Sequence, residues 1–470
     1  MTLFAPGDPR PVHFMGIGGA GMSALALLAR RRGVHVTGCD TEPSGAADLA
    51  ALGVPVWRGH DPAHVAGARA IVVTAAVARD HPELEGARAA GVAVVRRADA
   101  LGEVVSAAGS TLVAVAGTHG KTTTTVMTTE ALVAAGRDPT GLVGGRVAHW
   151  NGNARIGAPD LYVVEADEYD QAFLSLEPTI ALVTNVEADH LECYGGSVAA
   201  LESAFVQFAG RASRVIVGAD DTAGGAQRVA ARLNVPVWRV GSEPSADVRI
   251  RETVLGPEGS RAQVELPGGV AVAVALRVPG MHNVRNAAMA LAAVRAIGGD
   301  VTRAAAGLAS FAGVARRFQR VGEAAAVTVV DDYAHHPTEV RATLAAARQA
   351  FPGRRLVAVF QPHLYSRTAM HGEALGTALA AADLVIVAPI YGAREQPLPG
   401  VTADLVLRAA TQAGAMAVLV AERAGLTAAV AERVRPGDVV FTLGAGDVTR
   451  VGPELLERLV KPEGGKRVRA

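Results

Sequence analysis

The chain has 470 residues, half of them hydrophobic, and its 45 basic residues balance its 45 acidic residues. This length exceeds what one hydrophobic core usually serves, so about three domains are expected. The balanced charge gives no indication of nucleic-acid binding, and no uncharged apolar segment approaches the ~20 residues that span a bilayer.

The N-terminal segment MTLFAPGDPRPV lacks the basic and apolar regions of an export signal, so we expect a cytoplasmic protein without membrane insertion. The two cysteines, Cys39 and Cys193, lie in no paired metal or redox spacing. The cysteine pattern therefore favours neither a disulfide scaffold nor a zinc site.

Short β-branched runs alternate with alanine- and leucine-rich helical stretches along most of the chain. This alternation is typical of α/β folds with parallel sheets covered by helices on both faces. It breaks near residues 102–110 and again between about 241 and 279, where turn residues separate strands as in an antiparallel insert. A third series begins after ARRFQR at 315–320. We predict domains over residues 1–108, 109–315 and 316–470.

The first glycine-rich segment, GIGGAGMS, lies between a predicted strand and a predicted helix. Its glycines fit G-x-G-x-x-G, and an acid follows about 20 residues later at the end of the next strand, as a ribose-binding acid does. Such glycines let backbone N–H groups approach a pyrophosphate at a helix N-terminus. The pattern predicts a Rossmann-type domain without naming the nucleotide, and tight strand-to-helix packing is the alternative. The candidate residues are Gly16, Gly18, Gly19, Ala20, Gly21, Met22, Ser23 and Asp40.

The second glycine-rich segment, GTHGKT, is a shortened phosphate loop between the strand TLVAVA and a helical stretch. Its backbone amides can hold a β-phosphate, Lys121 can lie between the β and γ oxygens, and the Thr122 hydroxyl can bind Mg²⁺. The candidate phosphate-binding residues are Gly117, Thr118, His119, Gly120, Lys121, Thr122 and Thr123.

Two later strands supply candidate metal ligands. LYVVEADEYD is an apolar strand ending in acids, and Glu165 is placed to hold Mg²⁺ with Thr122, although a surface acid is the alternative. TIALVTNVEADHLE delivers His190 to the carboxyl edge of a neighbouring strand, where ligands gather in open α/β sheets. We predict Thr122, Glu165 and His190 as metal ligands, with His190 binding a second Mg²⁺. A solvent-exposed loop histidine is the alternative.

Five motifs in fixed order resemble the Mur ligases, the ATP-dependent amide-forming enzymes of peptidoglycan precursor synthesis. They are GTHGKTTTT, EADEYDQAFLSLEPTIALVTNVEADHLE, PGMHNVRNAAMA, ARRFQ and DDYAHHPTEV. The resemblance implies a three-domain architecture: an N-terminal Rossmann-like UDP-binding domain, a central P-loop ATPase domain with a small antiparallel insert, and a C-terminal Rossmann-like domain that binds the amino acid. GIGGAGMS and DDYAHHP are most similar to the branch that adds L-alanine to UDP-N-acetylmuramate, with ATP and Mg²⁺.

The resemblance also implies roles for single residues. Adenine-side contacts are expected at His282, Asn283 and Asn286. Arg317 is expected at the γ-phosphate and Asp332 at the ribose of ATP.

Further residues are expected near the alanine and the reacting acyl group, namely Tyr333, His335 and Arg367. His335 is a candidate base for the amine, with simple positioning of the substrate as the alternative. The expected catalytic residues are Lys121, His190, Arg317, His335 and Arg367.

Two positions depart from the family pattern. Leu364 stands where many relatives have an arginine, and LESAFVQF lacks the lysine that sister ligases carbamylate. Three alternative functions stay open: a nicotinamide-dependent oxidoreductase, a P-loop switch or transport ATPase, and a recycling ligase that joins UDP-N-acetylmuramate to a tripeptide. We expect a monomer or a homodimer.

Overall fold

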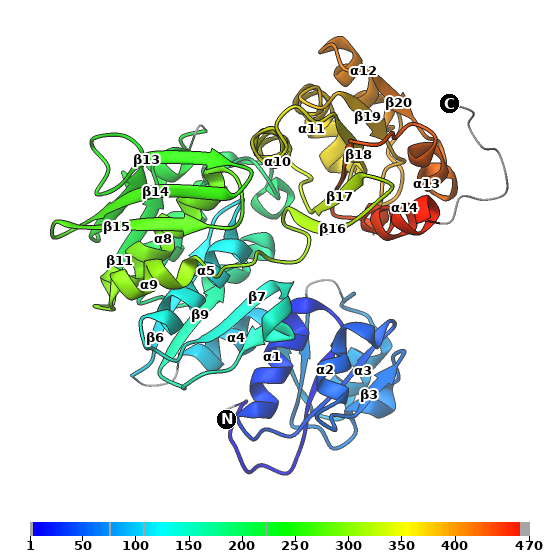
Figure 1. Ribbon diagram of the computed structural model, residues 1–470. Helices are drawn as coiled ribbons and strands as arrows, with labels where there is room; N and C mark the ends of the chain where they lie inside the picture. Colours follow the sequence, from blue (N-terminus) through cyan, green and yellow to red (C-terminus); the bar gives the residue numbers. More distant parts are fainter. Residues whose placement is uncertain (1–2, 75–76, 107–108, 222, 394, 461–470) are drawn as a thin grey trace. The chain divides into compact units, whose positions relative to one another are not determined.

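The computed structural model describes residues 3–74, 77–106, 109–221, 223–393 and 395–460. These residues form three β-sheets with accompanying helices (Figure 1) and divide into two compact units. The first sheet and most of the second sheet belong to the first unit, and the third sheet belongs to the second unit. The first unit comprises Met1–Thr253, Arg261–Ala275 and Val284–Phe311, and the second comprises Val254–Ser260, Leu276–Asn283 and Ala312–Ala470. The expected boundary at residue 108 lies outside the described residues, so the domain limits stay a prediction.

The first sheet has five parallel strands in the order β3-β2-β1-β4-β5. The strands are β1 (Val12–Met15), β2 (Val36–Asp40), β3 (Val56–Arg58), β4 (Ala70–Val73) and β5 (Ala93–Arg96). The helices are α1 (Ala20–Arg31), η1 (Pro43–Ala46), α2 (Ala47–Ala50), η2 (Pro62–Val65), α3 (Pro82–Ala89) and α4 (Arg97–Val105). Side chains of α1 and α4 pack on one face, and side chains of α3 pack on the other. The strand order reverses beside β1, which is where nucleotides bind in such sheets.

The second sheet has ten strands in the order β15-β14-β13-β12-β11-β10-β6-β9-β7-β8. The strands are β6 (Thr111–Ala116), β7 (Thr140–Val147), β8 (Gly152–Arg155), β9 (Leu161–Glu165), β10 (Ile180–Val183), β11 (Arg214–Gly218), β12 (Val237–Gly241), β13 (Val248–Gly256), β14 (Gly259–Leu266) and β15 (Val270–Leu276). The helices are α5 (Lys121–Ala134), η3 (Ala148–Trp150), η4 (Tyr169–Ser175), η5 (Leu191–Tyr194), α6 (Val198–Ala209), α7 (Gly225–Ala230), α8 (Met281–Ala296) and α9 (Val301–Leu308).

In the sheet order, every neighbouring pair between β12 and β7 is parallel. The edge strand β8 is antiparallel to β7. The strands β13, β14 and β15 lie side by side (Figure 1), and turns of two or three residues join them. Connections this short join antiparallel strands, so these strands form the expected antiparallel insert.

The third sheet has six strands in the order β16-β17-β21-β18-β19-β20, all parallel except the edge strand β16. The strands are β16 (Gln319–Ala324), β17 (Val327–Asp332), β18 (Leu356–Phe360), β19 (Leu384–Val387), β20 (Ala417–Leu419) and β21 (Val439–Leu443). The helices are α10 (Pro337–Ala350), α11 (Tyr365–Leu379), α12 (Asp404–Gln412), α13 (Arg423–Ala431), η6 (Asp447–Arg450) and α14 (Val451–Val460). Helices α10, α11 and α12 pack on one face, while α13 and α14 pack on the other. The expected α/β class with three sheets is confirmed.

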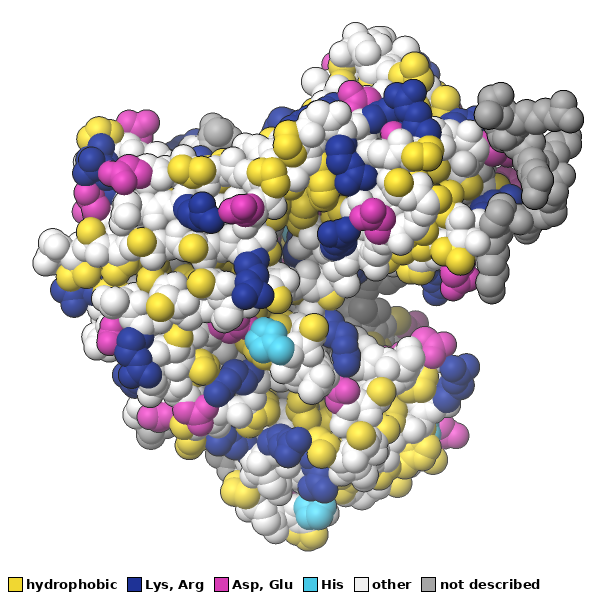
Figure 2. Space-filling model, in the orientation of Figure 1, with side chains coloured by type: hydrophobic (Ala, Val, Ile, Leu, Met, Phe, Trp, Pro, Cys, Tyr) yellow, Lys and Arg dark blue, Asp and Glu magenta, His cyan; other side chains and the backbone are white. Residues whose placement is uncertain are grey.

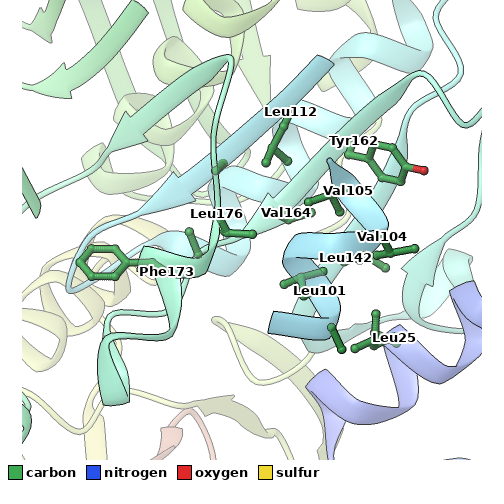
Figure 3. Close-up of a cluster of buried hydrophobic side chains, with 14 of the residues drawn as sticks. Leu25, Leu101, Val104, Val105, Leu112, Leu142, Tyr162, Val164, Phe173 and Leu176 are labelled. Carbon is green, nitrogen blue, oxygen red and sulfur yellow. The ribbon is translucent and has the colours of Figure 1, made fainter. Parts of the chain in front are cut away.

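One hydrophobic core joins the first and second sheets inside the first unit. Leu25 of α1 and Leu101 of α4 lie in the same cluster as Leu142 of β7 and Tyr162 of β9 (Figure 3). Burial of apolar area stabilises the folded state by about 25 cal/mol per Å². This shared core therefore holds α1 against the second sheet. The two glycine-rich segments are therefore held within one compact unit.

The visible surface carries charges of both signs. Lysine and arginine side chains are interspersed with aspartate and glutamate side chains on the face shown in Figure 2. In the described parts of the chain, every helix is too short or too polar to cross a membrane.

Candidate functional site

The first glycine-rich segment joins β1 to α1. Gly16 has a φ of 79°, a conformation that glycine adopts readily. A Cβ at Gly18 would lie 3.0 Å from Oδ2 of Asp40, and this oxygen accepts the N–H of Gly18 at 2.9 Å. Gly19 is the N-cap of α1 and supplies no capping side chain, which suits an anion at the first amides of the helix.

Two predicted residues of this segment also serve packing. Met22 is buried in the core. The Ser23 hydroxyl donates to the carbonyl of Ala20 at 3.1 Å and accepts from Nδ2 of Asn153 at 3.1 Å. Asn153 lies on β8, so Ser23 ties α1 to the second sheet.

The second glycine-rich segment joins β6 to α5. Gly117 has a φ of 129°, and a Cβ there would lie 2.1 Å from Oγ1 of Thr184. Gly120, with a φ of 82°, is the N-cap of α5 and has no capping side chain. The first amides of this 14-residue helix are therefore suited to a phosphate, as the sequence predicts.

The segment after β10 fixes the conformation of the phosphate loop. The N–H of His119 donates to Oδ1 of Asn185 at 2.8 Å, and Oγ1 of Thr118 accepts the N–H of Glu187 at 2.9 Å. β10 pairs directly with β6, which explains this proximity. Asn185 and Glu187 thus support the loop from the neighbouring strand.

Lys121 points back across the loop. Its Nζ donates to the carbonyl of Gly117 at 2.8 Å and lies 2.8 and 2.9 Å from the two carboxylate oxygens of Glu168. Burial alone would lower the pKa of Lys121, but the carboxylates of Glu168 and Asp167 outweigh it and raise the pKa above its usual value. Lys121 is therefore a fixed positive charge at the phosphate loop.

Thr122 and Glu165 form the candidate metal centre. The Thr122 hydroxyl lies 2.9 and 3.0 Å from the two carboxylate oxygens of Glu165, and the N–H of Gly144 donates to Oε2 at 2.6 Å. β9 pairs with β6, so the end of β9 meets the phosphate loop. A hydroxyl and a carboxylate are hard oxygen donors, and this pair fits Mg²⁺. Thr123, in the next position, is buried.

His190 lies in a loop with a φ of 53°. Its Nε2 is 3.8 Å from Oδ2 of Asp189, its Nδ1 is 3.6 Å from Oε1 of Glu192, and its ring lies 5.1 Å from that of Tyr169. These partners differ from Thr122 and Glu165, so its expected role at a second metal stays a prediction.

A cavity of about 240 Å³ lies between the first glycine-rich segment and the acids at the end of β9. Gly19, Ala20 and Gly21 at the start of α1 line one part of it, and Glu165 and Asp167 line another. A ligand held at the α1 N-terminus can therefore reach the candidate metal centre.

The helix α8 carries the three residues expected near adenine. Asn286 lies beside the phosphate loop, because a Cβ at Gly120 would lie 3.0 Å from its Oδ1. Nδ2 of Asn283 donates to the carbonyl of Pro279 at 2.7 Å. His282 packs on Gly280, where a Cβ would lie 2.6 Å from its ring.

In the second unit, aromatic and charged residues gather beyond the end of β17. The guanidinium carbon of Arg317 lies 5.0 Å from the ring centroid of Tyr333, and its Nη1 lies 3.7 Å from Oε1 of Glu339. The N–H of His335 donates to Oε2 of Glu339 at 3.0 Å. Glu339 thus organises two of the predicted catalytic residues.

His335 and Arg367 meet at His363. The rings of His335 and His363 are 5.9 Å apart, and Nη1 of the buried Arg367 lies 3.4 Å from Nδ1 of His363. Burial, together with the charges of His335 and Arg367, lowers the pKa of His363 to about 4. His363 is therefore neutral at neutral pH.

Asp332 ends β17 in a buried position. Its carboxylate accepts the N–H of Phe318 at 2.7 Å and the N–H of Ala334 at 2.8 Å. Burial raises its pKa to about 6, although Arg317 and these two N–H groups favour the ionised form.

Three family models match successive parts of the chain: the Mur ligase catalytic domain at residues 11–108, the Mur ligase middle domain at 115–294 and the Mur ligase glutamate ligase domain at 316–446. The chain is 45% identical to a UDP-N-acetylmuramate–L-alanine ligase of Clavibacter michiganensis over 99% of its own length and 96% of that protein. The chain belongs to the Mur ligase family. The family predicted from the motifs is thus confirmed.

Two solved structures resemble this Mur ligase over nearly its whole length. The UDP-N-acetylmuramate-alanine ligase of Thermotoga maritima is 29% identical with a TM-score of 0.80, covering 96% of this chain and 98% of that one. A murein peptide ligase of Psychrobacter arcticus is 27% identical with a TM-score of 0.72, covering 97% of this chain and 100% of that one. The three-domain Mur ligase fold is therefore confirmed.

Sequence reasoning did not single out several residues of this Mur ligase site. Three acids follow Glu165 in the sequence, Asp167, Glu168 and Asp170, and nothing in the sequence distinguishes them. Only the structure shows that Glu168 is the partner of Lys121. His363 and Glu339 carried no sequence signal of their own. The available clue was position: His363 follows β18, and Glu339 lies in the first turn of α10.

Proposed function

We propose that this Mur ligase joins L-alanine to the lactyl carboxylate of UDP-N-acetylmuramate and converts ATP to ADP and phosphate. The full-length similarity to proteins named for this reaction supports the substrates. The observation that carries the site assignment is the cavity between the start of α1 and Glu165. A UDP-sugar anchored at the first glycine-rich segment would bring its carboxylate to the candidate metal centre.

The chemistry explains why ATP is needed. A carboxylate is a poor electrophile, because attack places more negative charge on an anion that has no leaving group. A carboxylate oxygen attacks the γ-phosphorus and ADP leaves, which gives an acyl phosphate. The amine of L-alanine then attacks the acyl carbon, phosphate leaves, and the amine loses a proton.

Positioning and charge neutralisation dominate phosphoryl transfer. Lys121 supplies a fixed positive charge at the loop, and the amides at the start of α5 would hold the phosphates. Thr122 and Glu165 would hold Mg²⁺, which neutralises developing charge on the phosphoryl oxygens when bound. His190 is proposed for a second Mg²⁺. Arg317 is proposed for the γ-phosphate.

The adenosine of ATP is assigned to residues from α8 and the end of β17. His282, Asn283 and Asn286 are proposed at the adenine, and the position of Asn286 beside the phosphate loop supports this. Asp332 is proposed at the ribose.

The amine step is assigned to the cluster beyond β17. Nδ1 of His335 lies 2.9 Å from the carbonyl oxygen of Tyr333, so the Nδ1–H tautomer places a lone pair on Nε2. That nitrogen is the proposed proton acceptor for the amine. Arg367 and Tyr333 would bind the acyl group and the alanine. Closure over the site would exclude water, which otherwise hydrolyses the acyl phosphate.

The domain roles follow from these assignments. Residues 1–108 are proposed to bind the UDP-sugar, 109–315 to bind ATP and Mg²⁺, and 316–470 to bind the amino acid. A cytoplasmic monomer or homodimer that binds neither nucleic acid nor membrane is proposed.

The test is Mg²⁺-dependent phosphate release from ATP with UDP-N-acetylmuramate, supplied with L-alanine, with L-alanyl-γ-D-glutamyl-meso-diaminopimelate, or with neither. Release that requires both L-alanine and the sugar supports the proposal. Release only with the tripeptide would assign the chain to the recycling reaction. Phosphate release that depends neither on the acceptor nor on UDP-N-acetylmuramate would contradict any ligase function.

A further inference from the structure

A cluster of metal-ligating side chains lies in the first domain on the face of the sheet that packs against α3. His13 of β1, Cys39 of β2, His64 of η2 and Glu83 of α3 each place one ligand atom within 4.8 Å of the others. His13, Cys39 and Glu83 are fully buried, and the His64 side chain is 15% exposed. The cluster takes no part in the proposed ligase chemistry.

Four of the six separations between these atoms match the edges of a small tetrahedron, and the other two are within 4.8 Å. Nε2 of His13 lies 3.3 Å from Sγ of Cys39 and 3.3 Å from Oε1 of Glu83. The same Glu83 oxygen lies 3.2 Å from Sγ of Cys39 and 3.2 Å from Nδ1 of His64. Nitrogen, oxygen and sulfur ligands of a tetrahedral zinc ion lie about 3.3 to 3.5 Å apart, given the usual bond lengths. We propose that His13, Cys39, His64 and Glu83 bind one Zn²⁺.

The charges of the cluster favour a divalent cation. A buried carboxylate is costly unless a positive charge compensates it. On binding, the Cys39 thiol releases its proton to solvent and a zinc–sulfur bond forms, with no change in oxidation state. The thiolate and the Glu83 carboxylate then balance the two positive charges of the ion. Thiolate and imidazole ligands favour zinc over magnesium, which separates this site from the phosphate-loop centre.

Outer contacts orient the proposed ligands, as in established zinc sites. Nδ1 of His13, the nitrogen on the far side of its ring, lies 3.0 Å from Oγ1 of Thr37. Nδ1 of His60 lies 3.0 Å from Oε2 of Glu83. The His64 ring stacks on Trp57, with centroids 4.7 Å apart and planes at 11°.

The site would stabilise the nucleotide-binding edge of the first sheet. Four protein ligands leave no open position for substrate, which is typical of a structural zinc site. The carbonyl of Cys39 accepts the N–H groups of Gly16 at 2.8 Å and Ile17 at 3.1 Å. The ion would therefore hold β1, β2 and α3 together directly beside the first glycine-rich segment.

The test uses the full chain, stripped of metal and then loaded with Zn²⁺ or Co²⁺. We expect one zinc per chain by elemental analysis, a higher Tm on loading, and a near-ultraviolet sulfur-to-cobalt charge-transfer band. Cys39→Ser should remove this band, and His64→Gln should weaken zinc binding by at least about 100-fold. His60→Gln should weaken it by about 10- to 100-fold.

Matched variants control for the loss of a thiol or an imidazole elsewhere. Cys193→Ser and His35→Gln should leave the cobalt band and the zinc affinity as in the unaltered chain. The proposal is overturned if the unaltered chain binds no zinc after loading, or if its cobalt spectrum shows no thiolate band. A thiolate band that persists in Cys39→Ser would equally exclude the site.

Discussion

Lys121 forms an ion pair with the buried Glu168, with the ammonium nitrogen 2.8 and 2.9 Å from the two carboxylate oxygens. The pair holds the lysine at the phosphate loop, where its nitrogen also donates to the carbonyl of Gly117. Its charge is therefore in place before phosphate binds. The same pair makes the lysine important for stability, because its removal leaves a buried carboxylate without compensation.

Lys121→Met should abolish turnover and also destabilise the protein. The uncompensated Glu168 carboxylate should cost about 3 to 5 kcal/mol in the free energy of unfolding. Adding Glu168→Gln should recover most of that stability, while turnover stays lower by about 10³-fold or more. Denaturant unfolding and phosphate release from ATP measure the two effects. Near-normal turnover in the folded double variant would contradict the phosphate-loop assignment.

The metal assignment predicts a Mg²⁺-dependent defect at Thr122. Thr122→Val removes the hydroxyl but keeps the shape of the side chain. The Mg²⁺ concentration needed for half-maximal turnover should therefore rise by about tenfold or more, because one charge-assisted contact to the ion is lost. Thr122→Ser keeps the hydroxyl and should stay close to the unaltered enzyme. Equal behaviour of the two variants in a Mg²⁺ titration would remove Thr122 from the metal centre.

Gly117 tests the geometry of the phosphate loop. Gly117→Ala would place a Cβ 2.1 Å from Oγ1 of Thr184 at a φ of 129°, so the loop must shift. We expect ATP affinity to fall by at least about tenfold, in line with a strain of about 1 to 3 kcal/mol. Gly53→Ala is the matched control, since Gly53 also has positive φ but has open space around it. Calorimetric titration with ATP should separate the two, and a normal affinity in Gly117→Ala would refute the assigned loop geometry.

His363 should make the second unit sensitive to acid. Its pKa is about 4 in the folded protein against 6.5 ordinarily, so the unfolded chain binds more protons between these pH values. Its contribution to stability is fully present above about pH 6.5 and is lost as the pH falls toward 4. His363→Gln should therefore reduce the loss of unfolding free energy between about pH 7 and pH 5 by roughly 1 to 2 kcal/mol, allowing for partial solvent screening.

Denaturant unfolding of the full chain at the two pH values measures this difference. The exposed His35 provides the control, because His35→Gln should leave the acid sensitivity unchanged. An acid sensitivity of His363→Gln equal to that of the unaltered chain would contradict the effect.

The sequence was sufficient where a motif and its strand order define the geometry. GTHGKT follows a strand and opens a helix, and Glu165 ends a neighbouring strand, so their meeting at the sheet edge follows from the parallel topology. Glu168 was not predictable in this way, because it precedes the irregular helix η4, where Asp170 and Gln171 have positive φ. Which acid turns toward Lys121 depends on that local backbone.

The histidine and cysteine cluster of the first domain was also hidden in the sequence. His13, Cys39, His64 and Glu83 are separated by 26, 25 and 19 positions, as the numbering gives directly, and form no metal-binding motif. Only the packing of β1, β2, η2 and α3 brings them together. Cysteine spacing alone favoured no zinc site, whereas the folded arrangement supports one.

The proposed transfer of the γ-phosphoryl group of ATP to the carboxylate of UDP-N-acetylmuramate is the step on which the assigned function depends. It is tested most directly with a substrate whose carboxylate carries ¹⁸O in both oxygens, turned over with ATP, Mg²⁺ and L-alanine, followed by mass analysis of the released phosphate. An acyl phosphate predicts one ¹⁸O atom in each phosphate, because the carboxylate oxygen that attacks phosphorus leaves with it. Unlabelled phosphate, formed together with the alanyl product, would contradict the account.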